Sequence, residues 1–112
     1  MRIERSKMKK LIFLFSLFIA FQAVAQEGIR FRHCSWEEAK AMAKKEKKPI
    51  FIDFYTQWCG PCLNMAENIF TLGSVGNFYN DHFVCLKIDA ETGEGVELAK
   101  KYEVASFPTF VF

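Results

Sequence analysis

The chain has 112 residues, of which 51% are hydrophobic and 25% charged, a balance that is typical of one globular domain and too short for two. The first 25 residues hold five of the fifteen Lys and Arg and one Glu, a net of +4, so the whole-chain charge of +2 leaves −2 for residues 26–112. Because that remainder has no positive excess, its composition argues against nucleic-acid binding.

The N-terminal segment, residues 1–25, has the three parts of a secretory signal peptide. A basic stretch, MRIERSKMKK, is followed by the apolar run LIFLFSLFIAF and then by the small residues AVA. Residues 11–25 are short for the ~30 Å of hydrocarbon in a bilayer, although an uncleaved anchor stays the alternative. We therefore predict cleavage after Ala25, export to the periplasm of a bacterium, and a folded domain over residues 26–112.

A short strand and a helix are predicted next. GIRFRHC at 28–34 alternates apolar and polar positions, as strands do. Ser35 and Glu38 form the S-x-x-E pattern of a capping box, which begins a helix, and Pro49 ends it. The buried stripe of this helix is expected to comprise Trp36, Ala39, Met42 and Ala43.

A second strand precedes two closely spaced cysteines. IFIDFY at 50–55 is nearly all apolar, as in a strand covered on both faces, and Asp53 is its one charge. Cys59 and Cys62 follow at once, and PCLNMAENIF then resumes a helical pattern. We therefore expect both cysteines at a helix N-terminus, where Pro61 is tolerated because a first-turn N–H has no intrahelical partner.

The alternation of helices and strands continues to the end of the chain. A short helical stretch is expected within 72–82, a buried strand at 83–89, an amphipathic helix at 96–104 and a strand at 106–112. The order β-α-β-α-β-α-β indicates an α/β domain with an at least partly parallel sheet. The last strand has no partner, so we expect the sequence to be a fragment that lacks a hairpin strand and a closing helix.

Two thiols this close could serve as a redox pair, half of a metal site, a haem attachment point or a structural staple. A CxxC staple closes too short a loop to remove much chain entropy. Haem attachment requires a histidine where this chain has Leu63, and structural zinc requires ligands that no second CxxC or HxxxH pair supplies. His33 and His82 are the only histidines. Thiol–disulfide exchange is favoured, no metal ligand is predicted, and copper delivery stays a weaker alternative.

The motifs around the cysteines resemble those of the thioredoxin superfamily. WCGPC at 58–62 matches the thioredoxin active-site motif, and Asp53 stands six positions before its first cysteine. VASFPT at 104–109 is similar to the loop that carries the family's cis-proline, with Pro108 as the candidate. The resemblance covers residues 28–112 and extends to exported members and to the reducing C-terminal domain of DsbD-type proteins. It implies a thioredoxin-like α/β fold, in which helices flank a central mixed sheet.

The same residues suggest a mechanism. A thiolate attacks a disulfide, and a helix N-terminus stabilises a thiolate, so Cys59 is the expected nucleophile and Cys62 the resolving thiol. Asp53, buried in an apolar strand, would have a raised pKa and could take the Cys62 proton through water. The alternative for Asp53 is a strand-end charge that simply reaches solvent.

Five further residues are expected to contact substrate. Trp58 shields the cysteines and offers a flat surface, Gly60 lets a partner chain approach, and Pro61 stiffens the turn. By the resemblance, a cis Pro108 would place the backbone of Phe107 beside the cysteines, ready to pair with an extended substrate segment.

Two departures from the family's pattern concern the other cysteines. Cys85 is expected at the strand position where thioredoxins often carry a lysine, which would leave Asp53 without a cationic partner. Cys34 and Cys85 are expected as separate buried thiols, with a second disulfide between them as the alternative.

The Gly-Pro pair between the cysteines resembles the reducing end of the family's range, so a reductase is favoured over an oxidase or isomerase. No cofactor is expected beyond the redox-active Cys59–Cys62 disulfide. The expected partners of this monomer are proteins with disulfides and a membrane electron donor of the DsbD or CcdA type, because an exported reductase must be recharged.

Overall fold

The computed structural model describes residues 27–112, and the predicted signal peptide lies outside them. Within these residues, four helices and three strands follow one another: α2 (Trp36–Glu46), β1 (Ile50–Tyr55), α3 (Gly60–Asn68), α4 (Gly73–His82), β2 (Val84–Asp89), α5 (Gly95–Lys101) and β3 (Thr109–Val111). Among these helices, none combines the length and the apolarity that crossing a bilayer would need.

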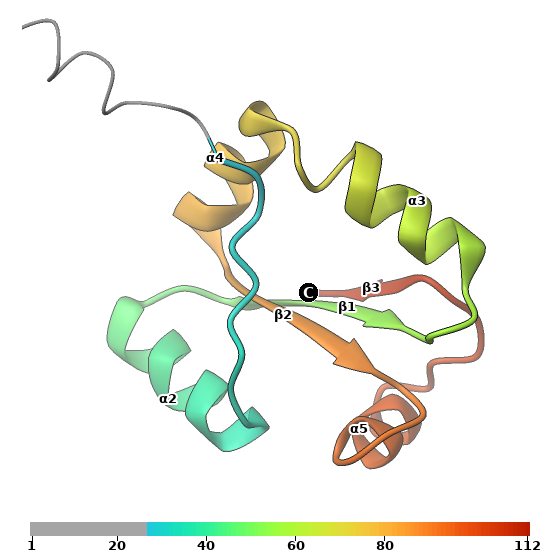
Figure 1. Ribbon diagram of the computed structural model, residues 1–112. Helices are drawn as coiled ribbons and strands as arrows, with labels where there is room; N and C mark the ends of the chain where they lie inside the picture. Colours follow the sequence, from blue (N-terminus) through green and yellow to red (C-terminus); the bar gives the residue numbers. More distant parts are fainter. Residues whose placement is uncertain (1–26) are drawn as a thin grey trace, which may run out of the picture.

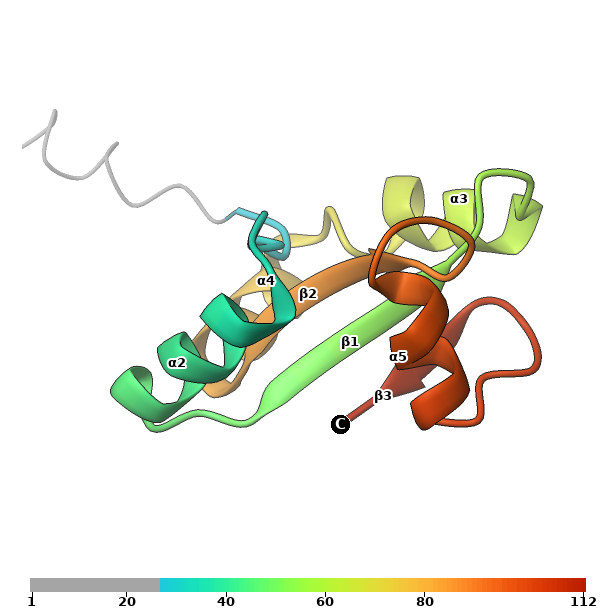
Figure 2. The ribbon, with the colours of Figure 1, turned by 90° about the horizontal axis from the view of Figure 1, so that it is seen from below.

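The three strands form one mixed sheet in the order β2-β1-β3. β1 runs parallel to β2 along its whole length, from Ile50 opposite Val84 to Tyr55 opposite Asp89, and β3 pairs with the other edge of β1 in the antiparallel sense. Helices α2 and α5 cover one face of the sheet, and α3 and α4 lie on the other (Figure 1, Figure 2). The expected fold, a mixed sheet between layers of helices, is thus confirmed.

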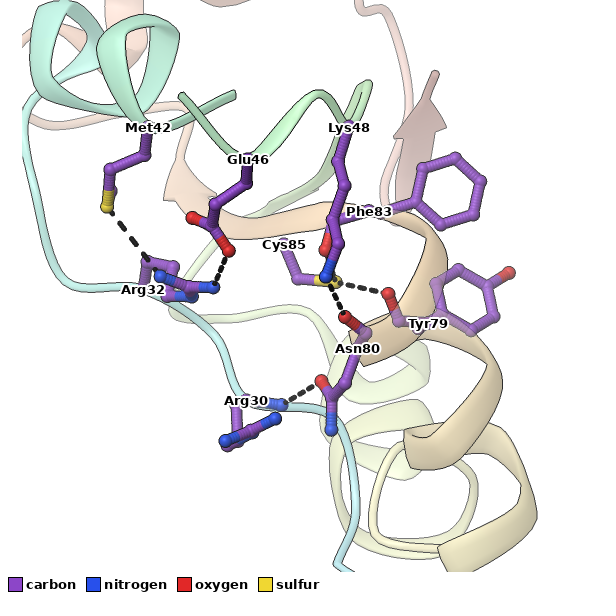
Figure 3. A network of polar contacts seen from close by, with 9 residues as sticks. All are labelled: Arg30, Arg32, Met42, Glu46, Lys48, Tyr79, Asn80, Phe83 and Cys85. Atoms are coloured by element: carbon purple, nitrogen blue, oxygen red, sulfur yellow. Dashed lines mark hydrogen bonds and ion pairs between the residues drawn. The ribbon is translucent and has the colours of Figure 1, made fainter. Parts of the chain in front are cut away.

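The predicted strand at 28–34 is the main error in the expected elements. The segment runs beside β2 but forms only one isolated parallel bridge, between Arg32 and Leu86. Its other backbone groups find different partners. The Asn80 side chain of α4 accepts a hydrogen bond from the Arg30 amide at 2.9 Å (Figure 3) and donates one to the Gly28 carbonyl at 3.1 Å. A side chain therefore satisfies the backbone where a regular ladder was expected.

Helix α2 begins as predicted and ends at Glu46, three residues before Pro49. Ser35 accepts a hydrogen bond from the Glu38 amide, and the Glu38 side chain accepts one from the Ser35 amide, which completes the capping box. The helix ends at Glu46 because Lys47 adopts a left-handed conformation with φ 55°, before Pro49 is reached.

The side chains of β1 alternate between two hydrophobic layers. Ile52 and Phe54 pack toward α2 and α5, with Ala39, Leu86, Leu98 and Ala99. Phe51 points to the other face and is 1% exposed. Rings surround it at centroid distances of 4.8–6.5 Å, from Phe31, Phe70, Tyr79, Phe83, Phe110 and Phe112. Asp53, two residues further along β1, is on this second face.

We predict that Phe51→Ala lowers the free energy of unfolding by about 3–5 kcal/mol, because it removes a buried ring whose neighbours come from five segments of the chain. Urea denaturation measures the loss. The matched control is Phe78→Ala on α4, where the ring is 54% exposed and the expected cost is below about 1 kcal/mol. Equal costs at both positions would contradict this account of the core.

Candidate active site

The Cys59–Cys62 pair lies where β1 passes into α3. Cys59 is the N-cap residue of α3, with extended backbone geometry, and Pro61 lies in the first turn. The two sulfurs form a disulfide, and Cys59 Sγ also accepts a hydrogen bond from the Cys62 amide at 3.1 Å. Cys59 is thereby placed where free N–H groups and the helix dipole favour a thiolate. Exposure does not separate the two, because Cys59 is 6% and Cys62 4% exposed in this disulfide form.

Asp53 lies in the middle of β1 and is 1% exposed. Neither carboxylate oxygen has a hydrogen-bond partner among the described residues. Burial raises the pKa of Asp53 to about 6, against an opposing effect of the Lys87 charge. A strand-end carboxylate that reaches solvent is therefore the wrong interpretation of this residue.

The expectation that Asp53 lacks a cationic partner is also wrong. Lys87 is its direct cross-strand partner in the β1–β2 ladder, whereas Cys85 lies opposite Phe51. Cys85 and Lys87 are two positions apart and so share a face of β2, which is why the sequence alone does not tell which of them faces Asp53. The Lys87 ammonium lies 5.0 Å from the centre of the Tyr55 ring. Its charge lowers the Asp53 pKa, but by less than burial raises it.

Cys34 and Cys85 are free thiols, as the favoured interpretation had it. Cys34 packs against the core cluster that lies under α2 and α5. Cys85 turns to the other face, where its sulfur lies 3.6 Å from the Tyr79 carbonyl oxygen of α4 (Figure 3). Since the sheet separates them, no second disulfide forms. Burial raises the pKa of Cys85 to about 11, which keeps it an unreactive thiol.

The predicted contact residues surround the disulfide. Trp58 is 70% exposed and its ring meets that of Phe107 edge to face, with centroids 6.1 Å apart. The Phe107–Pro108 peptide bond is cis, as the resemblance implied. No atom lies within 4 Å of the position that a Cβ on Gly60 would occupy, so this side of the disulfide is open. Pro61 is exposed beside it.

A cavity of about 240 Å³ adjoins the disulfide and includes residues that the sequence did not single out. It is lined by Tyr55, Thr56, Gln57, Trp58, Cys59, Gly60, Cys62, Leu63 and Lys87. Leu63 is exposed and adds apolar surface beyond Trp58. The Glu91 carboxylate accepts a hydrogen bond from Trp58 Nε1 at 2.7 Å. Glu91 lies in a turn, where no periodic pattern of residues could have predicted this contact.

A metal site has no support from this geometry. Over residues 27–112, no group of three or more His, Cys, Asp and Glu side chains lies close enough to bind one ion. The cavity beside the disulfide is lined by two sulfurs that are bonded to each other, and by no histidine.

The sequence model of the thioredoxin-like family matches residues 31–112, so the chain belongs to this family. Its fold and its CXXC disulfide are those of thioredoxin-like thiol–disulfide oxidoreductases. In sequence it is 42% identical over 73 residues to thioredoxin-1 of Drosophila yakuba, covering 65% of this chain and 64% of that protein. The chain thus spans slightly less than two thirds of the length of this relative.

Two solved structures show the same arrangement. A candidate disulphide-isomerase from Bacteroides thetaiotaomicron is 46% identical, with a TM-score of 0.70 over 80% of this chain and 74% of that one. A thioredoxin from Thermus thermophilus is 29% identical, with a TM-score of 0.67 over 76% of this chain and 64% of that one.

We predict that Asp53→Asn stabilises the oxidised protein at pH 8 and gains much less at pH 4.5. The folded-state pKa of about 6 lies above the unfolded value of 3.8, so the folded state holds its proton more tightly. This stabilisation is therefore full below about pH 4 and is lost as pH rises through about 6, by roughly 3 kcal/mol in all and by roughly 2 kcal/mol between pH 4.5 and 8. Urea unfolding of both proteins at the two pH values measures this, and a pH-independent difference would contradict it.

Proposed function

We propose that this protein reduces disulfides of exported proteins in a bacterial periplasm, with Cys59 as nucleophile and Cys62 as resolving thiol. The observation that carries the proposal is the Cys59–Cys62 disulfide at the N-terminus of α3, which follows the strand that holds the buried carboxylate of Asp53. The family supports thiol–disulfide exchange, and the signal-like segment at 1–25 supports export.

The reaction moves two electrons from the protein's dithiol to the substrate. The Cys59 thiolate attacks one sulfur of a substrate disulfide, which forms a mixed disulfide and releases one substrate thiolate. Cys62 then loses its proton and attacks Cys59 Sγ. The Cys59–Cys62 bond forms, the mixed disulfide breaks, and the second substrate thiolate leaves. The described structure corresponds to the product of this sequence, the oxidised protein.

Asp53 is the proposed acceptor of the Cys62 proton. A carboxylate with an ordinary pKa would be a poor base at neutral pH, whereas a pKa of about 6 brings it close to the operating range. Its two unpaired oxygens leave room in the hydrogen-bonding scheme for a bridging water. The Lys87 charge keeps the pKa from rising further.

The Gly60-Pro61 pair and the similarity to proteins named thioredoxin support the proposed reducing direction. In an oxidising compartment such a protein must be re-reduced after each turnover. We therefore propose a membrane electron donor of the DsbD or CcdA type as the recharging partner, and no cofactor beyond the cysteine pair.

Disulfide isomerisation is the second candidate, because the structure with 46% identity is described as a candidate disulphide-isomerase. Isomerisation also begins with attack by Cys59, but its substrate leaves with the same number of disulfides. Reactivation of scrambled ribonuclease without a net reductant distinguishes the two. A reductase restores little activity in that assay, whereas an isomerase restores most of it.

We predict that Cys59→Ser lowers the rate of insulin reduction by dithiothreitol to that of dithiothreitol alone, because no nucleophile remains. Cys62→Ser should also stop turnover but accumulate a mixed disulfide with insulin, seen as a band on non-reducing gels that a reductant removes. Cys34→Ser is the matched control and should keep the wild-type rate, since Cys34 is a free thiol outside the site. A wild-type rate no faster than Cys59→Ser would refute the reductase.

A further inference from the structure

The Thr56 hydroxyl is buried beside the disulfide without a hydrogen-bond partner. Thr56 directly follows β1 and is 2% exposed. Among residues 27–112, the buried side-chain polar atoms without a partner are the two oxygens of Asp53, the proposed proton acceptor, and Thr56 Oγ1. A buried hydroxyl that has lost water without a replacement hydrogen bond lowers stability. Thr56 is therefore unfavourable in the oxidised protein, and its presence there needs a reason.

The backbone of Thr56 is bonded to the expected nucleophile. The Cys59 amide donates a hydrogen bond to the Thr56 carbonyl at 3.3 Å, which closes a turn over residues 56–59. The first and last Cα atoms of such a turn are less than about 7 Å apart. Both residues also line the cavity of about 240 Å³ beside the disulfide. A change of side-chain rotamer at either residue can therefore bring Thr56 Oγ1 and Cys59 Sγ together.

The other donors around Cys59 are already engaged. Gln57 Nε2 and Trp58 Nε1 line the same cavity, and each donates to a carboxylate, at 3.1 and 2.7 Å. The Cys62 amide donates to Cys59 Sγ itself at 3.1 Å. Within the described residues, the Thr56 hydroxyl is thus the buried side-chain donor of this cavity whose proton has no acceptor.

Reduction of the disulfide changes what Cys59 Sγ can accept. In the disulfide the sulfur is uncharged and a weak acceptor, whereas a thiolate carries a full negative charge and forms strong, charge-assisted hydrogen bonds. A hydrogen bond to the charged form favours that form. A hydroxyl that has no partner in the oxidised protein and bonds the thiolate in the reduced protein stabilises only the reduced protein.

We propose that in the reduced protein the Thr56 hydroxyl donates a hydrogen bond to the Cys59 thiolate, which makes Thr56 a further catalytic residue of the site. This inference rests on the proposed function, since it names a group that activates the nucleophile of that function. With the bond, more of Cys59 is thiolate at neutral pH, and attack on a substrate disulfide is faster. Because the bond also favours the dithiol over the disulfide, its removal should give a slower nucleophile in a stronger reductant.

The direct test is the pKa of Cys59 in the reduced protein, measured from its rate of alkylation by iodoacetamide against pH, with mass spectrometry to follow Cys59 alone. Thr56→Val replaces the hydroxyl with a methyl group of similar size and should raise this pKa by about one pH unit, the equivalent of one hydrogen bond to a charged group. Thr56→Ser keeps the hydroxyl and should match wild type. Equal pKa values in wild type and Thr56→Val would overturn the proposal. If Thr56→Val fails to fold, Thr56→Ala removes the same hydroxyl and carries the same expectation.

The other titratable groups of the site do not change between these variants, so the difference in pKa reports the hydroxyl. The first turn of α3 holds no acidic residue. The groups come from β1, α3, β2 and the turn after β2: Asp53, Tyr55, Cys62, Lys87, Asp89 and Glu91. Thr71→Val is the matched control, because the Thr71 hydroxyl donates to the Glu67 carbonyl at 2.8 Å, outside the cavity. This control should leave the Cys59 pKa unchanged, and an equal rise there would also overturn the proposal.

The equilibrium with glutathione separates a catalytic role of Thr56 from a structural one. Oxidised glutathione takes two electrons from the dithiol, so that the Cys59–Cys62 bond forms and two glutathione thiols are released. A residue that only supports the fold would affect both redox forms alike. Thr56→Val should instead shift this equilibrium toward the protein disulfide by about fivefold or more at pH 8. No shift, or a shift toward the dithiol, would overturn the proposal.

Both measurements use the purified protein and no protein substrate. If the wild type fails to reduce insulin, the proposed function falls, and the Cys59 pKa values still decide whether Thr56 bonds the thiolate. If the wild type reduces insulin and Thr56→Val has an unchanged Cys59 pKa, the proposed function stands and this inference falls.

Discussion

The burial of one carboxylate is the constraint on which the rest of the site depends. Asp53 lies in the middle of the central strand, 1% exposed, and its carboxylate oxygens have no hydrogen-bond partner among the described residues. A buried charge is unfavourable, so the group keeps its proton to a higher pH than usual. Two residues before Asp53 on the same face of β1, Phe51 packs among aromatic rings that include Phe70 and Tyr79. The residue with the proposed catalytic role is thus one that is unfavourable for stability at its own position.

The parallel ladder between β1 and β2 connects the buried Asp53 with the residues at the end of β2. Its register places Lys87 opposite Asp53, and the Lys87 charge limits the rise in the Asp53 pKa. Two residues further along, it places Asp89 opposite Tyr55. From Asp89 the contacts continue through Glu91 to Trp58, beside the disulfide. One pairing of two strands therefore sets the partners of both Asp53 and Tyr55. A slip of β2 by one residue would turn Lys87 and Asp89 to the opposite face of the sheet.

The features that the sequence predicted are those with a local signal. The capping box before α2, the buried run 50–55, the cysteines at a helix start and the cis Pro108 each follow from a short pattern or a family motif. The errors concern pairings between distant segments. A strand was expected at 28–34, where the Asn80 side chain takes the backbone contacts, and Lys87 was missed because register is set by tertiary packing. Glu91 lies in a turn whose partner is 33 residues away, which no periodicity encodes.

A reducing site in an oxidising compartment is useful only if its disulfide is harder to reduce than those of its substrates. The proposed direction requires the Cys59–Cys62 disulfide to be of this kind, and the Gly60-Pro61 pair between its cysteines, which resembles the reducing end of the family's range, supports that. Equilibration of the purified protein with glutathione or dithiothreitol buffers gives the reduction potential of the pair directly. The account predicts a value close to that of thioredoxin, about −270 mV. A value above about −150 mV would contradict it, because the protein would then oxidise the dithiols it is proposed to produce.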